Sequence, residues 1–336
     1  MTLPPQAPRV VHGDCLEIMK MLPDNSVDSI VTDPPYGLGF MGKAWDALPP
    51  GEEWARECLR VLKPGGHLLA FGGSRTWHRL AVAVEDAGFE IRDSIAWLYG
   101  SGFPKHRAAL KPAFEPVVMG RKPYKGSLTA NEAEHGTGAL NIEACRIDTD
   151  ELKPYSPGIH RDSPSSFNDD AWKGREEVKP APSGRWPANV VLDDTTAEML
   201  DGQSGYQRDG VAVQRNGGGQ AVFGGIGSGK NAIGARADQS YGGGGGASRF
   251  FYVAKAPKSE RPVVDGIAHP TVKPLALMRW LARLVTPEGG TVLDPFAGSG
   301  TTVEACILEG LHCIAIEREA EYLPLIQARI SRQDAA

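Results

Sequence analysis

The sequence has few cysteines and no long apolar run. Its five cysteines are scattered, and no two of them have the CxxC spacing of structural zinc sites, so neither a disulfide framework nor a bound metal is expected. The sequence contains no run of about 18 apolar residues, the length that a membrane helix needs. Its first residues also lack the apolar core of a secretory signal. We therefore expect a cytoplasmic protein that does not bind membranes.

The sequence also lacks a strong excess of charge of one sign. Its formal net charge is −5 at pH 7, which does not indicate a polyanion-binding protein as a whole. Residues 101–130, however, contain one acid, Glu115, and six basic residues: Lys105, Arg107, Lys111, Arg121, Lys122 and Lys125. A local basic face could contact phosphate groups, and a solvated loop would explain the same pattern.

Glycine and proline, in contrast, are abundant. Together they make up 67 of 336 residues, and 13 of the 41 glycines lie between residues 217 and 246 without the three-residue period of collagen. Within this tract, residues 224–231 match a phosphate-binding loop, but Asn231 replaces the Ser or Thr that would hold Mg²⁺. ATP binding is therefore not expected.

Both ends of the chain alternate between strand and helix patterns. This alternation, over residues 9–100 and 270–333, predicts an α/β fold with a parallel, doubly wound sheet. The middle of the chain is irregular and contains only two short strand candidates, at 189–193 and 250–255. We expect one discontinuous α/β domain formed by residues 1–100 and 262–336, which an insert at 101–261 interrupts.

A glycine-rich turn follows the predicted strand that ends at Asp294. Ligands bind at the carboxyl ends of strands in open α/β sheets, and glycine lets the backbone approach them closely. Glu317 ends the next predicted strand, 23 residues later, where its carboxylate could accept two hydrogen bonds from a ribose diol. The segment is not a GxGxxG motif, and simple turn geometry is the alternative explanation.

A second turn, Asp33-Pro34-Pro35-Tyr36, also follows a predicted strand. The prolines fix φ and lack N–H groups, so this turn presents backbone carbonyls as acceptors beside the Asp33 carboxylate. Tyr36 adds a flat face on which an aromatic ring could stack. Two acceptors and a stacking face suit an amino group on a heterocycle, although a rigid structural turn would need the same residues.

Taken together, the motifs carry a family resemblance. The segments TDPPYG, HPTVKP (269–274) and LDPFAGSGTT resemble the amino-methylating DNA methyltransferases that use S-adenosylmethionine, and their order is similar to the β group of that family. The resemblance covers residues 9–100 and 269–333, about half of the chain. GRWPANVVLD and SRFFYVAKA are similar to less specific stretches of phage and bacterial members.

This resemblance implies a Rossmann-like methyltransferase fold with a mostly parallel seven-stranded sheet, one strand of which is reversed. It implies that Glu317 binds the ribose, that Asp14 lies near the adenine, and that Thr271 and Lys273 hold the methionine end of S-adenosylmethionine. A cap on the following helix is the alternative role of Asp14. The complete implied cofactor set is Asp14, Cys15, Asp33, Thr271, Lys273, Asp294, Phe296, Ala297, Gly298, Ser299, Gly300, Thr301, Glu317 and Arg318.

The same resemblance implies methyl transfer to the N6 atom of a flipped-out adenine in double-stranded DNA. The amino group would donate to Asp33 and to the Pro34 carbonyl, and the base would stack on Tyr36, so Asp33, Pro34, Pro35 and Tyr36 form the predicted catalytic set. DPPY favours adenine over cytosine N4 without excluding cytosine. A catalytically silent DNA-binding protein is a further alternative, and methylation of RNA or of a protein amide is less favoured by the motif order.

The insert would then hold target recognition. Its six basic residues are the predicted phosphate contacts, and its glycine-rich part, about 200–248, is expected to be mobile without DNA. A flexible linker without DNA contact is the alternative. We expect a solitary methyltransferase, bacterial or phage-encoded, whether of phage, regulatory or restriction-paired origin. From the resemblance alone, we also expect a homodimer.

Overall fold

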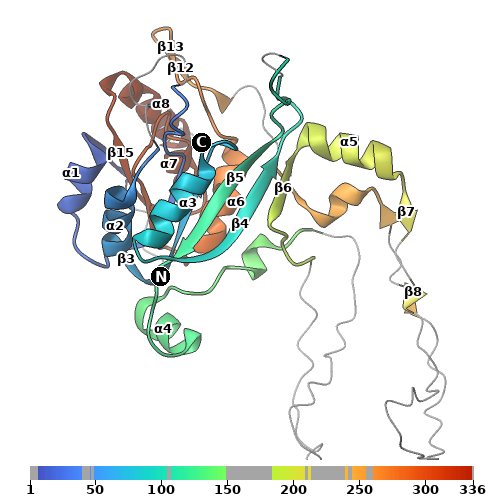
Figure 1. The fold of residues 1–336 in the computed structure, drawn as a ribbon, viewed down its shortest axis with the longest axis horizontal. Coiled ribbons are helices and arrows are strands. Elements are labelled where there is room, and N and C mark those ends of the chain that lie inside the picture. Colours follow the sequence, from blue (N-terminus) through green and yellow to red (C-terminus); the bar gives the residue numbers. More distant parts are fainter. Residues whose placement is uncertain are drawn as a thin grey trace, which may run out of the picture.

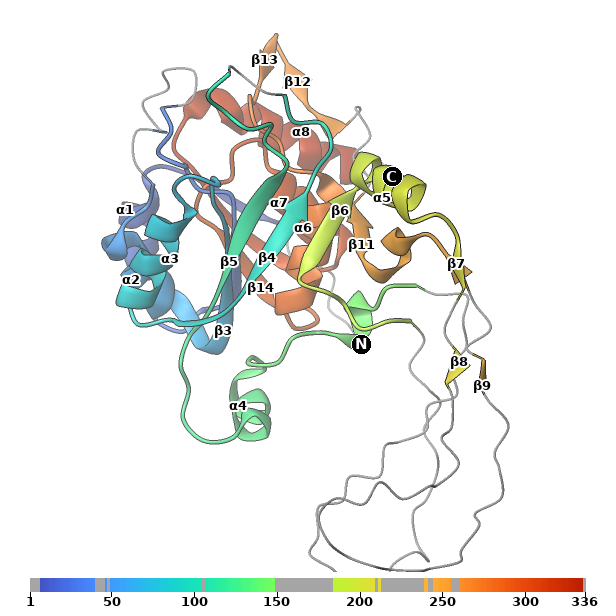
Figure 2. The same cartoon turned by 45° about the vertical axis from the view of Figure 1, so that its right-hand side comes forward.

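The computed structural model describes residues 7–39, 46, 49–103, 107–148, 184–208, 211–212, 239–240, 244–254 and 260–334. These residues form one large sheet between two layers of helices (Figures 1 and 2). The glycine-rich tract, which we expect to be mobile, and the phosphate-loop-like segment 224–231 fall mainly or wholly outside the described residues.

The central sheet has nine strands among the described residues. In spatial order they are β1 (Arg9–His12), β15 (His312–Glu317), β14 (Thr291–Asp294), β2 (Val27–Thr32), β3 (Leu62–Phe71), β5 (Phe114–Arg121), β4 (Glu90–Leu98), β6 (Val190–Asp193) and β11 (Tyr252–Ala254). Only β5 runs antiparallel to its neighbours, and the other neighbouring strands pair in parallel. The doubly wound, mostly parallel sheet is therefore as the sequence predicts, and one reversed strand is as the family resemblance implies.

Eight α-helices accompany the sheet in the described part of the chain. They are α1 (Cys15–Lys20), α2 (Glu52–Val61), α3 (Trp77–Asp86), α4 (Leu128–His135), α5 (Asp194–Ser204), α6 (Leu275–Val285), α7 (Thr301–Leu308) and α8 (Leu323–Asp334). Short 3₁₀ turns occur at Glu143–Cys145, Ala247–Phe250 and Ala320–Tyr322. None of the described helices combines the length and the apolarity needed to cross a bilayer.

Alternation along the strands produces two cores, one on each face of the sheet. In β2, Ile30 belongs to the core beneath α1–α3, whereas Val31 belongs to the core beneath α6–α8. β3 repeats the pattern with Leu68 and Leu69, because successive strand residues point to opposite faces. All six residues of β2 are buried, as expected for a central parallel strand that is covered on both faces. Figure 2 shows the two helical layers on either side of the sheet.

The sheet differs from the expected seven strands because the insert extends it. β6 pairs with β4, and β11 pairs with β6, so residues 190–193 and 252–254 form the outer two strands. The reversed strand β5 also lies within residues 101–261. The insert is therefore not a separate unit in the structure: three of its segments belong to the central sheet.

The sequence reading missed the reversed strand and two helices of the insert. β5 contains Pro116, which cannot donate a ladder hydrogen bond and argues against a central strand. Its carbonyl nevertheless accepts from the Gly72 N–H at 2.9 Å. Three small antiparallel pairs complete the fold: β7 (Gln207–Arg208) with β10 (Gly244–Gly245), β8 (Val211–Ala212) with β9 (Gln239–Ser240), and β12 (Val263–Val264) with β13 (Ile267–Ala268).

Candidate active site

The candidate site lies at the carboxyl edge of the parallel strands, where the direction of the sheet's winding switches. From β14 the chain continues to β15 on one side, whereas β2 leads to β3 on the other side. Open α/β sheets bind ligands at such a switch point. A cavity of about 1180 Å³ opens there, and its lining includes the ends of β14, β15 and β2 and the beginning of β5. Within the described residues, no group of three or more His, Cys, Asp and Glu could hold a metal ion.

Glu317 ends β15 and holds the glycine-rich turn in place. Its Oε2 atom accepts from the Gly298 N–H at 2.7 Å, and its Oε1 atom accepts from the Glu319 N–H at 2.7 Å. Burial outweighs these two hydrogen bonds and raises the pKa of Glu317 to about 7. Each carboxylate oxygen has a second lone pair, so the group can still accept from a ligand's hydroxyl groups.

Asp294 ends β14 and is buried. Its Oδ1 atom accepts from the Thr32 hydroxyl on the neighbouring strand β2 at 2.6 Å and from the Phe296 N–H at 3.1 Å. Burial is the largest cause of a pKa raised to about 6, and the hydrogen bonds oppose it. The carboxylate thus joins the two strands at the switch point.

The glycines of the turn are required by backbone geometry. Gly298 has φ +52° and Gly300 has φ +79°, which is the left-handed region that non-glycine residues rarely adopt. A Cβ atom at Gly300 would also lie 3.0 Å from Ile326 Cγ2 of α8. This close packing positions the first turn of α7, and it explains why Gly300 does not itself line the cavity.

Asp14 has the structural role that was the alternative in the sequence analysis. Its side chain accepts from the Leu16 and Glu17 N–H groups and caps α1. Asp14 and Cys15 nevertheless line the same cavity as the glycine-rich turn. Burial raises the pKa of Cys15 to about 12, so its thiol is not a nucleophile at neutral pH.

A carboxylate that the sequence reading missed anchors the turn after β2. Asp46 Oδ1 accepts from the N–H groups of Tyr36 and Gly37 at 2.6 and 2.9 Å, and its Oδ2 accepts from Leu38 at 3.2 Å. The Thr76 hydroxyl donates to the Tyr36 carbonyl at 2.7 Å. The Asp-Pro-Pro-Tyr turn is therefore held from both sides, and nothing in the sequence separates Asp46 from other loop acids.

The side chains of this turn form a charged network with Lys273. The Lys273 ammonium lies 2.6 Å from Asp33 Oδ2 and 3.3 Å from Glu115 Oε2. The Tyr36 hydroxyl lies 2.9 Å from Asp33 Oδ1 and 2.9 Å from Glu115 Oε2. Burial lowers the pKa of Lys273, but the two carboxylates more than reverse this effect and the pKa is raised, so the ammonium is charged at neutral pH.

The structure brings most of the predicted site residues together. All four residues of the predicted catalytic set line the cavity. So do all members of the implied cofactor set except Gly300: Asp14, Cys15, Asp33, Thr271, Lys273, Asp294, Phe296, Ala297, Gly298, Ser299, Thr301, Glu317 and Arg318. Lys273, which the resemblance assigns to the methionine end of the cofactor, contacts Asp33 and Tyr36 in this structure.

The five predicted phosphate contacts that the structure describes do not share one surface. Lys105 lies outside the described residues, Arg107 is exposed near the tip of the β4–β5 hairpin, and Lys111 lines the cavity. β5 then runs away from the cavity for eight residues, about 24 Å, so Arg121, Lys122 and Lys125 lie toward the opposite edge.

Two of these distant basic residues have structural partners. Arg121 pairs with Glu90 at 2.5 Å, and the Lys122 ammonium donates to the Asn25 side chain and the Leu62 carbonyl, each at 2.7 Å. Arg121 and Lys122 therefore have structural roles around β5, where an ion pair and hydrogen bonds hold their side chains. The described basic residues between positions 107 and 130 thus do not form one continuous face.

The sequence did contain a signal for Glu115. It is the single acid among the six basic residues of 101–130, and it stands directly before Pro116. Trp97 on the neighbouring strand β4 and Tyr99 just after that strand also line the cavity, and their rings lie 5.0 Å apart. These two aromatic residues were missed because reading a strand from its pattern does not reveal which of its ends faces a ligand.

Comparison with known proteins identifies related sequences over almost the full chain. The chain is 33% identical over 333 residues to the Type II methyltransferase M.HpaI of Haemophilus parainfluenzae, which covers 97% of this chain and 74% of that protein. Among solved structures, the M1.HpyAVI–SAM complex shares 19% identity and a TM-score of 0.47 over 96% of this chain and 100% of the other. The PvuII cytosine-N4-specific DNA methyltransferase shares 16% identity and a TM-score of 0.48 over 99% and 93%.

A family model described as DNA methylase matches residues 27–328. The match includes the Asp-Pro-Pro-Tyr turn, the whole insert, the glycine-rich turn and Glu317. Together with the identity to M.HpaI, it covers both halves of the candidate site. The chain therefore belongs to the DNA methylase family.

Proposed function

We propose that this DNA methylase transfers the methyl group of S-adenosylmethionine to N6 of an adenine that is flipped out of double-stranded DNA. The observation that carries the proposal is the shared cavity: Asp294 and Glu317 lie at one side of the switch point, and Asp33 and Tyr36 lie at the other. A cofactor and a base bound to these two halves would meet at the junction of β14 and β2.

The residues of the cofactor half fit the groups of S-adenosylmethionine. Glu317 offers acceptor lone pairs for ribose hydroxyls, and the glycine-rich turn offers a backbone without side chains to block a ligand. Phe296 and Cys15 provide apolar surface in the same cavity. When it is bound, the cofactor supplies a methyl group that a positively charged sulfur already activates.

The base half would position the amino group for attack. Asp33 and the Pro34 carbonyl are acceptors for its two hydrogens, and such hydrogen bonds leave the nitrogen lone pair directed away from them. Positive charge develops on this nitrogen during transfer, and the nearby carboxylate stabilises it electrostatically. The Tyr36 hydroxyl is held by the charged network, which fixes the ring as a stacking surface.

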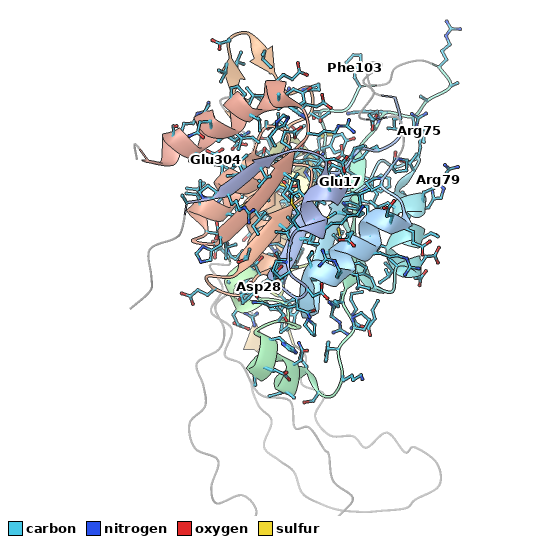
Figure 3. All side chains as sticks on the ribbon, turned by 90° about the vertical axis from the view of Figure 1, so that its left-hand side faces the viewer. Glu17, Asp28, Arg75, Arg79, Phe103 and Glu304 are labelled. Atoms are coloured by element: carbon cyan, nitrogen blue, oxygen red, sulfur yellow. The ribbon has the colours of Figure 1, made fainter. Side chains whose placement is uncertain are left out.

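DNA would approach the cavity mouth beside the β4–β5 hairpin. Arg75, which precedes α3, lines the cavity together with Lys111 of the hairpin, and Arg107 is exposed on that hairpin. Figure 3 shows Arg75 and Phe103 at the end of the domain opposite Asp28, which lies at the start of β2. Basic residues here would contact phosphates. Recognition of a specific target sequence, in contrast, requires contacts to base edges. The related M.HpaI carries the name Type II methyltransferase.

Nucleoside mass spectrometry of DNA treated with the enzyme tests the product. N6-methyladenine supports the proposal, whereas N4-methylcytosine would establish the same chemistry on the other base. Asp33→Ala tests the site: we expect the rate of methyl transfer to fall by more than about 10³-fold with cofactor affinity within a few-fold. Asp86→Ala, on the exposed surface of α3, is the matched control. Retained activity of Asp33→Ala would refute the acceptor role. The homodimer and the cytoplasmic location stay predictions.

A further inference from the structure

The network around Lys273 contains one more carboxylate than charge balance requires. Lys273 contributes one positive charge, and Asp33 and Glu115 contribute two negative charges, all within 3.3 Å of the ammonium. The Lys273 side chain is 8% exposed, and the two acids are about one-fifth exposed. Two carboxylates so close together are unfavourable unless each one has a partner. The second acid therefore calls for an explanation.

The Tyr36 hydroxyl shows how the two acids are related. It lies 2.9 Å from an oxygen of each carboxylate, but it has a single hydrogen and can donate to only one of them at a time. Lys273 likewise reaches both acids, at 2.6 Å for Asp33 and 3.3 Å for Glu115. Both donors can thus exchange between the two acids with little movement.

In the structure, each oxygen of Asp33 already accepts from one donor. Oδ1 faces the Tyr36 hydroxyl and Oδ2 faces Lys273. Each oxygen keeps a second lone pair, but a carboxylate that already accepts from a buried ammonium is a weaker acceptor for an incoming amino group. Asp33 would therefore accept the target amino group more strongly if the lysine charge moved to another carboxylate.

We propose that Glu115 is a positioning residue for methyl transfer: it takes over Lys273 and the Tyr36 hydroxyl when the target base arrives, and so frees Asp33 to accept the amino group. This inference rests on the proposed function. The excess negative charge also remains beside the amino nitrogen as positive charge develops on it. Glu115 itself does not touch the reacting atoms.

The reversed strand brings Glu115 to this place, and a glycine leaves room for the Tyr36 ring beside it. Because β5 is antiparallel to its neighbours, its second residue lies at the cavity edge, where the parallel strands end. The strand between β2 and β5 is β3, and Gly72 and Gly73 follow it directly. A Cβ atom at Gly73 would lie 3.0 Å from Tyr36 Cδ2. The absence of a side chain at Gly73 therefore leaves room for the Tyr36 ring.

The test is the single-turnover rate with saturating DNA and cofactor. We expect Glu115→Gln to lower this rate by about 10- to 100-fold while cofactor affinity stays within a few-fold. Glu115→Asp keeps the charge and should recover part of the loss. Glu90→Gln removes an exposed carboxylate of the neighbouring strand and is the matched control. A wild-type rate for Glu115→Gln overturns the proposal.

Two readouts separate this role from a merely structural one. First, the Glu115→Gln rate should rise more steeply with alkaline pH than the wild-type rate, because losing the ammonium charge releases Asp33. His269 lines the same cavity and titrates in both proteins, so the comparison cancels its effect. Glu115 also helps to raise the pKa of Tyr36 and of Tyr99, so the second readout is needed to assign the change to Lys273. Second, adding Lys273→Met to Glu115→Gln should restore part of the rate at saturating cofactor, because no ammonium then occupies Asp33.

A parallel pH profile together with no recovery in the double variant overturns the exchange, even if Glu115→Gln folds poorly. The outcomes also distinguish a failure of the proposed function from a failure of the role proposed for Glu115. If Asp33→Ala stays active, the proposed function fails. If Asp33→Ala is inactive and Glu115→Gln is fully active, the proposed function stands and only the role of Glu115 fails.

Discussion

The two halves of the cavity hold their carboxylates in different ways. In the cofactor half, Glu317 accepts from two backbone N–H groups, and Asp294 accepts from a backbone N–H and a buried hydroxyl. In the base half, Asp33 and Glu115 share two side-chain donors, Lys273 and Tyr36. Backbone donors cannot change partner without a change of fold, whereas side-chain donors can. The first half is thus preorganised, and the second could rearrange around the base that we propose enters it.

The largest expected effect comes from distorting the preorganised half. Gly300→Ala places a Cβ atom at φ +79°, 3.0 Å from Ile326 Cγ2. We expect a loss of about 1–3 kcal/mol in the free energy of unfolding and a cofactor affinity weakened by about 10- to 100-fold. Thermal melting and calorimetric titration would measure the two effects. Gly310→Ala, at φ +68° with open space around it, controls for strain alone. Unchanged cofactor affinity in Gly300→Ala would contradict a rigid cofactor turn.

The next effect should come from loosening the base half without touching its network. Asp46→Ala removes the acceptor of three consecutive N–H groups, and leaving them unpaired costs about 1–3 kcal/mol. We expect the methyl-transfer rate to fall by about tenfold with cofactor affinity unchanged, as a kcat effect in steady-state kinetics. Asp46→Asn keeps one acceptor oxygen, so its methyl-transfer rate should lie between those of the wild type and Asp46→Ala. Equal losses of cofactor affinity and rate would show that the two halves are not separable.

DNA contacts offer a third comparison, between the two ends of β5. Arg107→Ala and Lys111→Ala, both near the cavity, are made separately. Each should reduce the slope of log affinity against log salt by about 0.9, the value for one phosphate contact. Arg121→Ala with Lys125→Ala, toward the other edge, should leave it unchanged. Fluorescence anisotropy at several salt concentrations measures these slopes. The opposite result would move the DNA surface to the far edge of the sheet.

The smallest effect is a pH dependence of the cofactor half. Because hydroxyl donors favour the ionised form of Glu317, whose pKa burial raises to about 7, cofactor binding should release a proton near neutral pH. Cofactor affinity should then fall as pH drops below about 7, by at most about tenfold per pH unit. Calorimetry in buffers of different ionisation enthalpy counts the proton. Proton uptake instead of release would exclude an ionised Glu317 as the ribose acceptor.

The same raised pKa has the opposite consequence for the cofactor-free protein. The folded state binds the Glu317 proton more tightly than an unfolded chain with a pKa of 4.5, so this group's contribution to stability falls as pH rises from about 4.5 to about 7. Asp294, raised from 3.8 to about 6, acts in the same direction. Cofactor-free thermal melts across this range should show the decline, and saturating cofactor should reduce it.

Much of this protein was determined by local sequence. The periodicity of apolar residues predicted the strands and helices of residues 9–100 and 270–333, because burial against the sheet requires apolar residues at regular spacing. The Asp-Pro-Pro-Tyr and glycine-rich turns predicted residues that line the cavity, since proline fixes the backbone and glycine permits conformations closed to other residues. Asp14, Asp33, Asp294 and Glu317 follow predicted strands, and their meeting at one edge follows from a parallel sheet.

Only the tertiary structure decided which distant residues complete the site. The basic stretch 101–130 reads as one feature in the sequence, but the reversed strand β5 carries its two ends to different edges of the sheet. The same reversal brings Glu115 to Asp33, and the loop fold brings Asp46 to Tyr36. Such contacts depend on strand direction and order rather than on local pattern. A lone acid in a basic segment therefore acquires its partners only when the sheet has formed.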